Sequence, residues 1–179
     1  EAGAMLSGAW KIEGVKAILL KWLNDDEKSI LAVTALGEIG DVSSRKTLIK
    51  IIDDNETNVE TKAHAITAIA RSNLLESAAY ASELMSEAKT PKPVKTILEF
   101  FLTRKDGPNF LADAISGKKM KANVAGEAVR MTIASGGETK KLIQELSKAG
   151  SLQTVQAGLS DSEMRDLMNL VKSEGSPQR

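Results

Sequence analysis

The segment AVTALGEIG, residues 32–40, has a pattern that returns along the chain. A small apolar residue opens it and another apolar residue follows three positions later, which is the spacing of one helix face. The pattern recurs at intervals of 31 residues, in AHAITAIAR (63–71), VKTILEFFL (94–102) and AGEAVRMTI (125–133). A second series lies out of phase with the first and also has a spacing of 31: IKIIDDNE (49–56), YASELMSEA (80–88), LADAISGKK (111–119) and LIQELSKAG (142–150). Two interleaved helices per period predict a stack of helical hairpins.

Residue size within the first series supports this stack. Its small first position and its apolar fourth position would let helices of successive hairpins approach closely. The first position is occupied by Ala32, Ala63, Val94 and Ala125, and the fourth by Ala35, Ile66, Ile97 and Ala128. Turn residues recur between the expected helices, and Pro91, Pro93 and Pro108 suit the first turn of a helix, where a missing N–H is no loss.

The whole pattern predicts an all-α fold, an α-α superhelix of about four to five helical hairpins with a C-terminal capping helix. We expect a single domain over 1–179, in which 1–13 is the remnant helix of a preceding hairpin, 14–150 forms the hairpins, 151–173 forms the capping helix and 174–179 is a linker to a further domain. A capping box, Ser160 and Glu163, begins the last helix. Its apolar face is expected to consist of Met164, Leu167, Met168 and Val171.

Composition excludes several classes of site. The chain has 24 basic and 24 acidic residues, so it lacks the excess positive charge of a typical nucleic-acid-binding protein. It contains no cysteine, which rules out thiolate chemistry and Cys-ligated metal. No apolar run approaches the roughly 18 residues of a membrane span. We therefore expect no nucleic-acid partner, no membrane insertion and no cofactor bound by these residues.

Residues 35–71 resemble bacterial HEAT repeats. The run Ala-Leu-Gly-Glu-Ile-Gly-Asp, followed by Leu48-Ile49 and an acidic turn before the next helix, is close to the HEAT pattern. The chain departs from that pattern at Pro91-Lys92-Pro93, which replaces the usual acidic helix start, and no repeat has a clear arginine after its acidic turn. The resemblance implies an armadillo-type solenoid.

Residues 30–179 are also similar to the HEAT region of exported multidomain haem proteins. Those proteins join a sorbosone-dehydrogenase-like propeller, HEAT repeats and a C-terminal cytochrome c domain with a Cys-x-x-Cys-His motif. The ending Gly175-Ser176-Pro177-Gln178-Arg179 is similar to their Gly-Asp-Pro-x-Arg stretch, with Ser176 in place of Asp. The resemblance implies a parent protein of dehydrogenase or electron-transfer type, haem c bound beyond Arg179, and a periplasmic or exported location.

Each candidate for chemistry has a structural alternative. His64, the single histidine, would need a cluster of partners to act as a metal ligand or general base, and a half-exposed structural role is favoured. The acidic turns at 24–27 and 53–56 could suggest calcium, but they lack EF-hand spacing and suit helix capping. The basic stretch 117–123 could contact phosphate, although a solvated turn is favoured. Trp22 is expected to pack with Leu19 and Leu23.

The remaining candidate is a partner-binding surface on the concave side of the stack. Its residues lie at matched positions of successive hairpins and alternate in charge, which suits a polar protein contact. They are His64, Lys95, Glu99, Glu127 and Arg130. The sequence thus predicts a non-enzymatic HEAT scaffold that binds a protein or neighbouring domains. Two alternatives are a HEAT-like DNA-binding or DNA-glycosylase module and a chromophore-lyase-type HEAT protein.

Overall fold

The computed structural model describes residues 15–25 and 27–152, and the regular structure in these residues is entirely helical. The predicted all-α class is therefore confirmed for this part of the chain. The helices are α2 (Lys16–Trp22), α3 (Ser29–Ile39), α4 (Val42–Asp53), α5 (Val59–Ala70), α6 (Leu74–Glu87), α7 (Pro91–Leu102), α8 (Gly107–Ile115), α9 (Ala122–Ser135) and α10 (Lys140–Ala149).

The predicted terminal segments fall almost wholly outside the described residues. These are the remnant helix at 1–13, the capping helix with Met164, Leu167, Met168 and Val171, and the linker at 174–179. Only Ser151 and Leu152 of the predicted capping segment are described, and they follow α10 without forming a helix.

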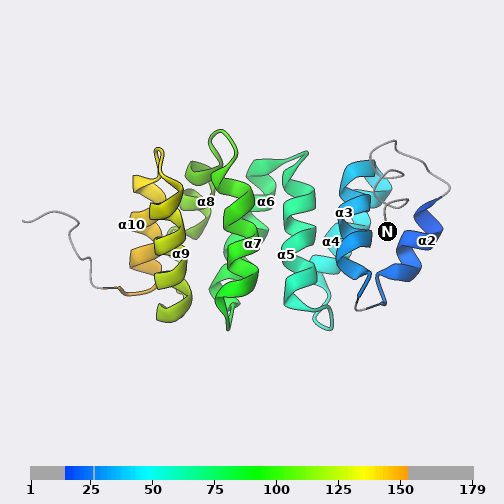
Figure 1. Ribbon diagram of the computed structural model, residues 1–179, viewed down its shortest axis with the longest axis horizontal. Coiled ribbons are helices and arrows are strands. Elements are labelled where there is room, and N and C mark those ends of the chain that lie inside the picture. The colour runs from blue at the N-terminus through cyan, green and yellow to red at the C-terminus, as the bar shows by residue number, and fades with distance from the viewer. Residues whose placement is uncertain (1–14, 26, 153–179) are drawn as a thin grey trace, which may run out of the picture.

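The helices form two layers that run along the long axis of the molecule. In one layer α3 contacts α5, α5 contacts α7 and α7 contacts α9, while in the other α6 contacts α8 and α8 contacts α10. Figure 1 shows α5, α7 and α9 standing side by side, with α6 and α8 behind them. Consecutive helices also pack across the layers, as α5 does against α4 and α6. A helix such as α5 or α7 therefore contacts both its neighbours along the chain and its counterparts one period away.

The first repeated series supplies the centre of this packing. Its first and fourth positions are all at most 1% exposed, from Ala32 and Ala35 in α3 to Ala125 and Ala128 in α9. The second series is less uniform, since Leu111 and Leu142 are buried whereas Ile49 and Tyr80 are only partly buried. The apolar positions predicted from the first series are thus confirmed as core.

The core consists of two clusters that meet at α5. The smaller cluster joins α2 to α5, where Leu19 is buried and Trp22 and Leu23 pack against it, as predicted. The larger one extends from α5 to α10 and includes Phe101. Helix α5 serves both clusters because its apolar residues cover more than one face.

Helix starts follow the predicted signals. Pro91 begins α7, and Pro108 lies in the first turn of α8. Asp41, Asn58 and Asn73 cap α4, α5 and α6 by accepting backbone N–H groups at 2.7, 2.8 and 3.1 Å. These contacts satisfy amides that a helix leaves unpaired at its N-terminus. Within the described residues, no helix has the length and apolar character that a membrane span needs.

Ion pairs link corresponding helices across the repeats. Arg45 of α4 pairs with Glu76 of α6, and Asp113 of α8 pairs with Lys141 of α10. Pairs of this kind on a surface contribute roughly 0–1 kcal/mol each. They help to align successive helices, while most of the stability of the stack comes from the burial of apolar side chains.

Candidate functional site

All five residues of the predicted binding surface lie on one layer of helices. His64 is on α5, Lys95 and Glu99 are on α7, and Glu127 and Arg130 are on α9. We call this surface the α5–α9 face. Because α5, α7 and α9 are successive neighbours in the layer, the structure brings these residues onto adjacent elements.

The charges of the α5–α9 face are already paired within their own helices. The Lys95 ammonium lies 3.7 Å from the Glu99 carboxylate, and the Arg130 guanidinium lies 2.8 Å from that of Glu127. Both are local pairs, at i,i+4 and i,i+3. A partner approaching this face therefore meets neutralised pairs in place of an extended field of one sign.

His64 is half-buried, and its surroundings favour the neutral imidazole. Burial lowers the pKa of His64, and the negative charge of Glu60 opposes this shift. The Glu60 carboxylate is itself paired with Lys92 of α7 at 2.8 Å. Over residues 15–25 and 27–152, no group of three or more His, Asp or Glu side chains could hold a metal ion.

A groove of about 580 Å³ lies beside this face, at the edge of the stack where α4 turns into α5 and α6 turns into α7. Apolar side chains from both sides of these turns line it, namely Ile52, Val59, Tyr80, Leu84, Ala88 and Pro93. Val59 is 47% exposed, an unusual position for a large aliphatic residue. The groove combines an apolar lining with ordered helix ends, which is typical of a binding site.

Charged side chains surround the apolar lining. Asp53, Glu60, Glu83 and Glu87 contribute carboxylates, and Lys62 and Lys89 contribute ammonium groups. Glu60 is paired with Lys92, and Glu83 is paired with Lys118 from the turn after α8. Asp53 and Glu87 have no ion pair within the described part of the chain. The groove therefore retains two carboxylates that an incoming cation could meet.

The turn at one side of the groove is held by its own acidic residues. Asp54 accepts a hydrogen bond from the Thr57 hydroxyl at 2.6 Å and another from the Glu56 N–H at 3.1 Å. These bonds, the Thr57 one foremost, hold the pKa of Asp54 below its usual value. The side chain of Asn58 then caps α5. The acidic residues of 53–56 thus stabilise the turn, while the side chain that caps α5 is that of Asn58, just beyond the predicted stretch.

The groove itself was not predicted from the sequence. A usable signal was Tyr80, which occupies the position of the second series where Leu111 and Leu142 are buried. An amphipathic tyrosine at an otherwise aliphatic core position indicates that this position meets solvent. The closeness of residues 52–62 to residues 80–93 could not be inferred, because it depends on how successive hairpins pack.

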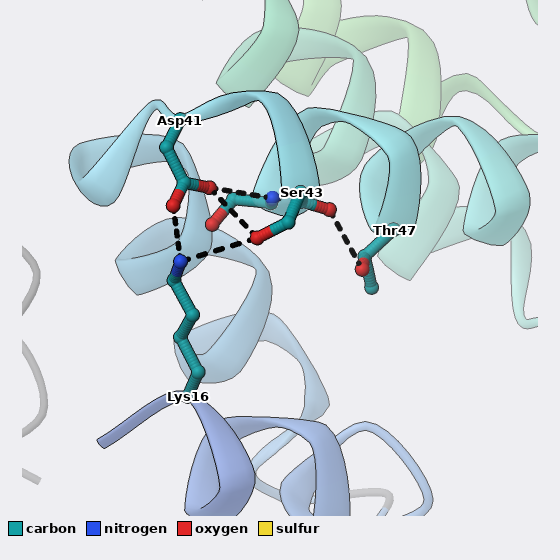
Figure 2. Close-up of polar contacts among 5 residues, drawn as sticks. Lys16, Asp41, Ser43 and Thr47 are labelled. Atoms are coloured by element: carbon teal, nitrogen blue, oxygen red, sulfur yellow. Dashed lines mark hydrogen bonds and ion pairs between the residues drawn. The ribbon is translucent and has the colours of Figure 1, made fainter. Parts of the chain in front are cut away.

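A second polar cluster joins α2 to the start of α4 (Figure 2). Lys16 donates to the carboxylate of Asp41 and to the hydroxyl of Ser43, the latter at 3.1 Å. Ser43 in turn donates to Asp41 at 3.1 Å, and the Thr47 hydroxyl donates to the Ser43 carbonyl at 3.1 Å. Nothing in the sequence indicates that Lys16 approaches Asp41.

The Lys16 cluster resembles a serine–lysine pair but is arranged for structure. A lysine can activate a serine only when its nitrogen is free to accept a proton. Here the nitrogen donates to Asp41, and this bond is the main reason that the pKa of Asp41 lies far below its usual value. Asp41 also caps α4 through the Ser44 N–H. The cluster thus fastens α2 to the α3–α4 turn.

No protein-family model, curated protein or solved structure matches this chain.

Proposed function

We propose that this chain is a HEAT-type helical-repeat domain that binds a protein partner and carries no chemistry of its own. The two-layer packing, the 31-residue spacing and the buried first series support a solenoid of this type. In such a stack each repeat contacts only its neighbours, so the surfaces between repeats are available for binding.

The groove beside α5 and α7 is the single observation that carries the proposal. It is large enough for several side chains, and its lining is mostly apolar with charges at the border. Protein interfaces have this same composition, with an apolar centre inside a polar rim. We therefore place the main binding site in the groove, where Glu60 contributes to the lining and is held by its ion pair with Lys92 of α7.

Peptide selection can test this site. A random peptide library selected against the full chain should yield binders whose affinity depends on the groove. Val59→Glu puts a charge on the apolar lining, and because Val59 is exposed at the start of α5 the helix tolerates it. We expect this variant to weaken the selected peptides about tenfold or more, as the loss of a central contact does.

A matched control uses the α5–α9 face. Lys95→Ala combined with Arg130→Ala removes two exposed charges and should leave peptide affinity unchanged. Fluorescence anisotropy would measure both effects, and circular dichroism would confirm folding. If the peptides bind the Val59→Glu variant with unchanged affinity and bind the control variant more weakly, the site lies on the α5–α9 face and the groove assignment is wrong.

We also propose, from the sequence resemblance, that the parent protein is an exported haem-containing dehydrogenase or electron-transfer protein. The gene beyond Arg179 provides the test. A Cys-x-x-Cys-His motif within a few tens of codons would support this parentage, and a gene that encodes only HEAT-like repeats would contradict it.

A further inference from the structure

Charged residues are separated by sign along the edge of the stack that holds the groove. Three successive turns of this edge, which continues beyond them with the turn before α3, carry these charges. The acidic turn, residues 53–58, contains exposed Asp53, Asp54 and Glu56. The basic turn, residues 116–121, contains Lys118, Lys119 and Lys121, of which the last two are exposed. Between them lies the middle turn, residues 87–92, with exposed Glu87 and Lys89.

The spacing of these turns is nearly regular. The helices that follow them are successive neighbours in one layer, because α5 contacts α7 and α7 contacts α9. At about 8–10 Å per helix step, the acidic and basic turns lie roughly 16–20 Å apart, with the middle turn halfway. A two-fold axis through the middle turn would therefore exchange the positions of the acidic and basic turns.

We propose that the partner at the groove is a second copy of this chain, bound antiparallel along this edge. In this dimer the basic turn of each copy lies against the acidic turn and the groove of the other. The inference rests on the proposed function, since it names the occupant of the same groove. The contact is isologous, so it closes at two copies.

Charge and shape both suit this occupant. Asp53 and Glu87 of the groove have no ion pair within the described residues. Lys119 and Lys121 of the basic turn also have no ion pair there. A lysine side chain can lay its aliphatic stem on apolar surface while its ammonium reaches a carboxylate. Lys119 and Lys121 of one copy can thus cover the lining around Val59 and meet Asp53 and Glu56 of the other.

The middle turn is compatible with its place on the two-fold axis. Glu87 and Lys89 have opposite charges and lie two residues apart. These two charges offset each other, and Lys92 of the same turn is already paired with Glu60, so the middle turn has little net charge with which to repel its copy. The Glu83–Lys118 pair stays within each copy and keeps the basic turn in place.

The α5–α9 face offers no comparable match. Its charged residues pair within single helices, so a second copy would gain little by meeting them. The separation of sign along the groove edge is what distinguishes it.

Charge reversal tests the dimer. The acidic-turn variant carries Asp53→Lys and Glu56→Lys, and the basic-turn variant carries Lys119→Glu and Lys121→Glu. None of these side chains caps a helix in the structure. Sedimentation velocity of the full chain should show a dimer for the native protein, and its dissociation constant should rise about tenfold between 50 and 500 mM NaCl as the charges are screened.

Each variant alone should be monomeric, because the reversed turn faces a turn of its own sign in the second copy. An equimolar mixture should dimerise again, since every contact then joins opposite signs. Lys95→Glu with Arg130→Glu on the α5–α9 face serves as the control and should remain dimeric.

Three results would overturn the inference: a native chain that is monomeric at low salt, a dimer that survives both reversals, or a mixture that stays monomeric. The proposed function can fail separately. A monomeric native chain that still binds peptides in a Val59-dependent way would remove the second copy and keep the groove as a binding site for another protein.

Discussion

The α3–α5 contact and the α7–α9 contact are built on the same 31-residue period, yet one position of the repeat has small residues in the first contact and charged residues in the second. Gly37 and Ala68 occupy this position in α3 and α5, where they touch, and a Cβ built on Gly37 would lie 2.7 Å from that of Ala68. Glu99 and Arg130 occupy it in α7 and α9, where both are exposed. The first contact is closed by small residues, and the second leaves a polar surface.

A neighbouring position shows the same change along the stack. Val33 is buried, His64 is half-buried, Lys95 is exposed, and Gly126 has open space where its side chain would be. The period therefore determines where the helices lie, while the residues at one or two positions decide whether a face is core or surface. The α5–α9 face begins where these positions no longer carry buried residues.

Removing Phe101 should produce the largest change in this comparison. Phe101 is fully buried on α7 and belongs to the larger core cluster, where it is one of the largest fully buried side chains. Phe101→Ala should lower the free energy of unfolding by about 3–5 kcal/mol. Urea titration would measure the loss. Phe100→Ala, at a partly buried neighbour, should have a clearly smaller effect, and equal losses would contradict the assignment of Phe101 to the core.

Glycine-to-alanine substitutions should have opposite effects on stability at the α3–α5 contact and on α9. Gly37→Ala forces the new methyl against Ala68 and should destabilise the protein by about 1–3 kcal/mol, despite the better helix propensity of alanine. Gly126→Ala meets nothing within 4 Å and should stabilise α9 by about 0.5–1 kcal/mol. Thermal and urea unfolding would compare them. Stabilisation by both substitutions would mean that α3 and α5 are not in close contact.

Breaking a charge pair on the α5–α9 face should change the free energy of unfolding only slightly. Glu99→Gln removes the partner of Lys95, and both side chains are about 60% exposed. We expect a loss of about 0.3–0.5 kcal/mol that disappears in high salt, because exposed i,i+4 pairs are weak and screened. A loss several times larger would show that this pair is buried by something outside the described residues.

The smallest expected effect is the contribution of His64 to the pH dependence of the free energy of unfolding. The folded protein holds the pKa of His64 below its ordinary value of 6.5 because of burial. The unfolded chain therefore binds more protons as the pH falls through 6.5, so stability should decrease on acidification and recover above that pH. His64→Gln should remove this part of the pH dependence in urea titrations between pH 5 and 8. An unchanged profile would assign it to other groups.

Local pattern was sufficient for the helices and for much of the core. Helical periodicity, the prolines at the starts of α7 and α8, and the small residues of the first series all depend on neighbours within a few positions. The exposed α5–α9 face was also visible, because matched positions 31 residues apart carry charges. These features were readable because each involves a single helix and its repetition.

The groove, the pairing of charges and the Lys16 cluster depended on tertiary structure. The groove requires the ends of α4 and α6 to lie beside the starts of α5 and α7, and Lys16 meets Asp41 only because α2 packs at the end of α3. The acidic and basic turns were each visible in the sequence, but their placement along one edge was not. The sequence by itself determined which segments are helices and which faces they bury, since those follow from local spacing. Tertiary structure alone decided which turns share an edge, because that depends on how distant helices pack.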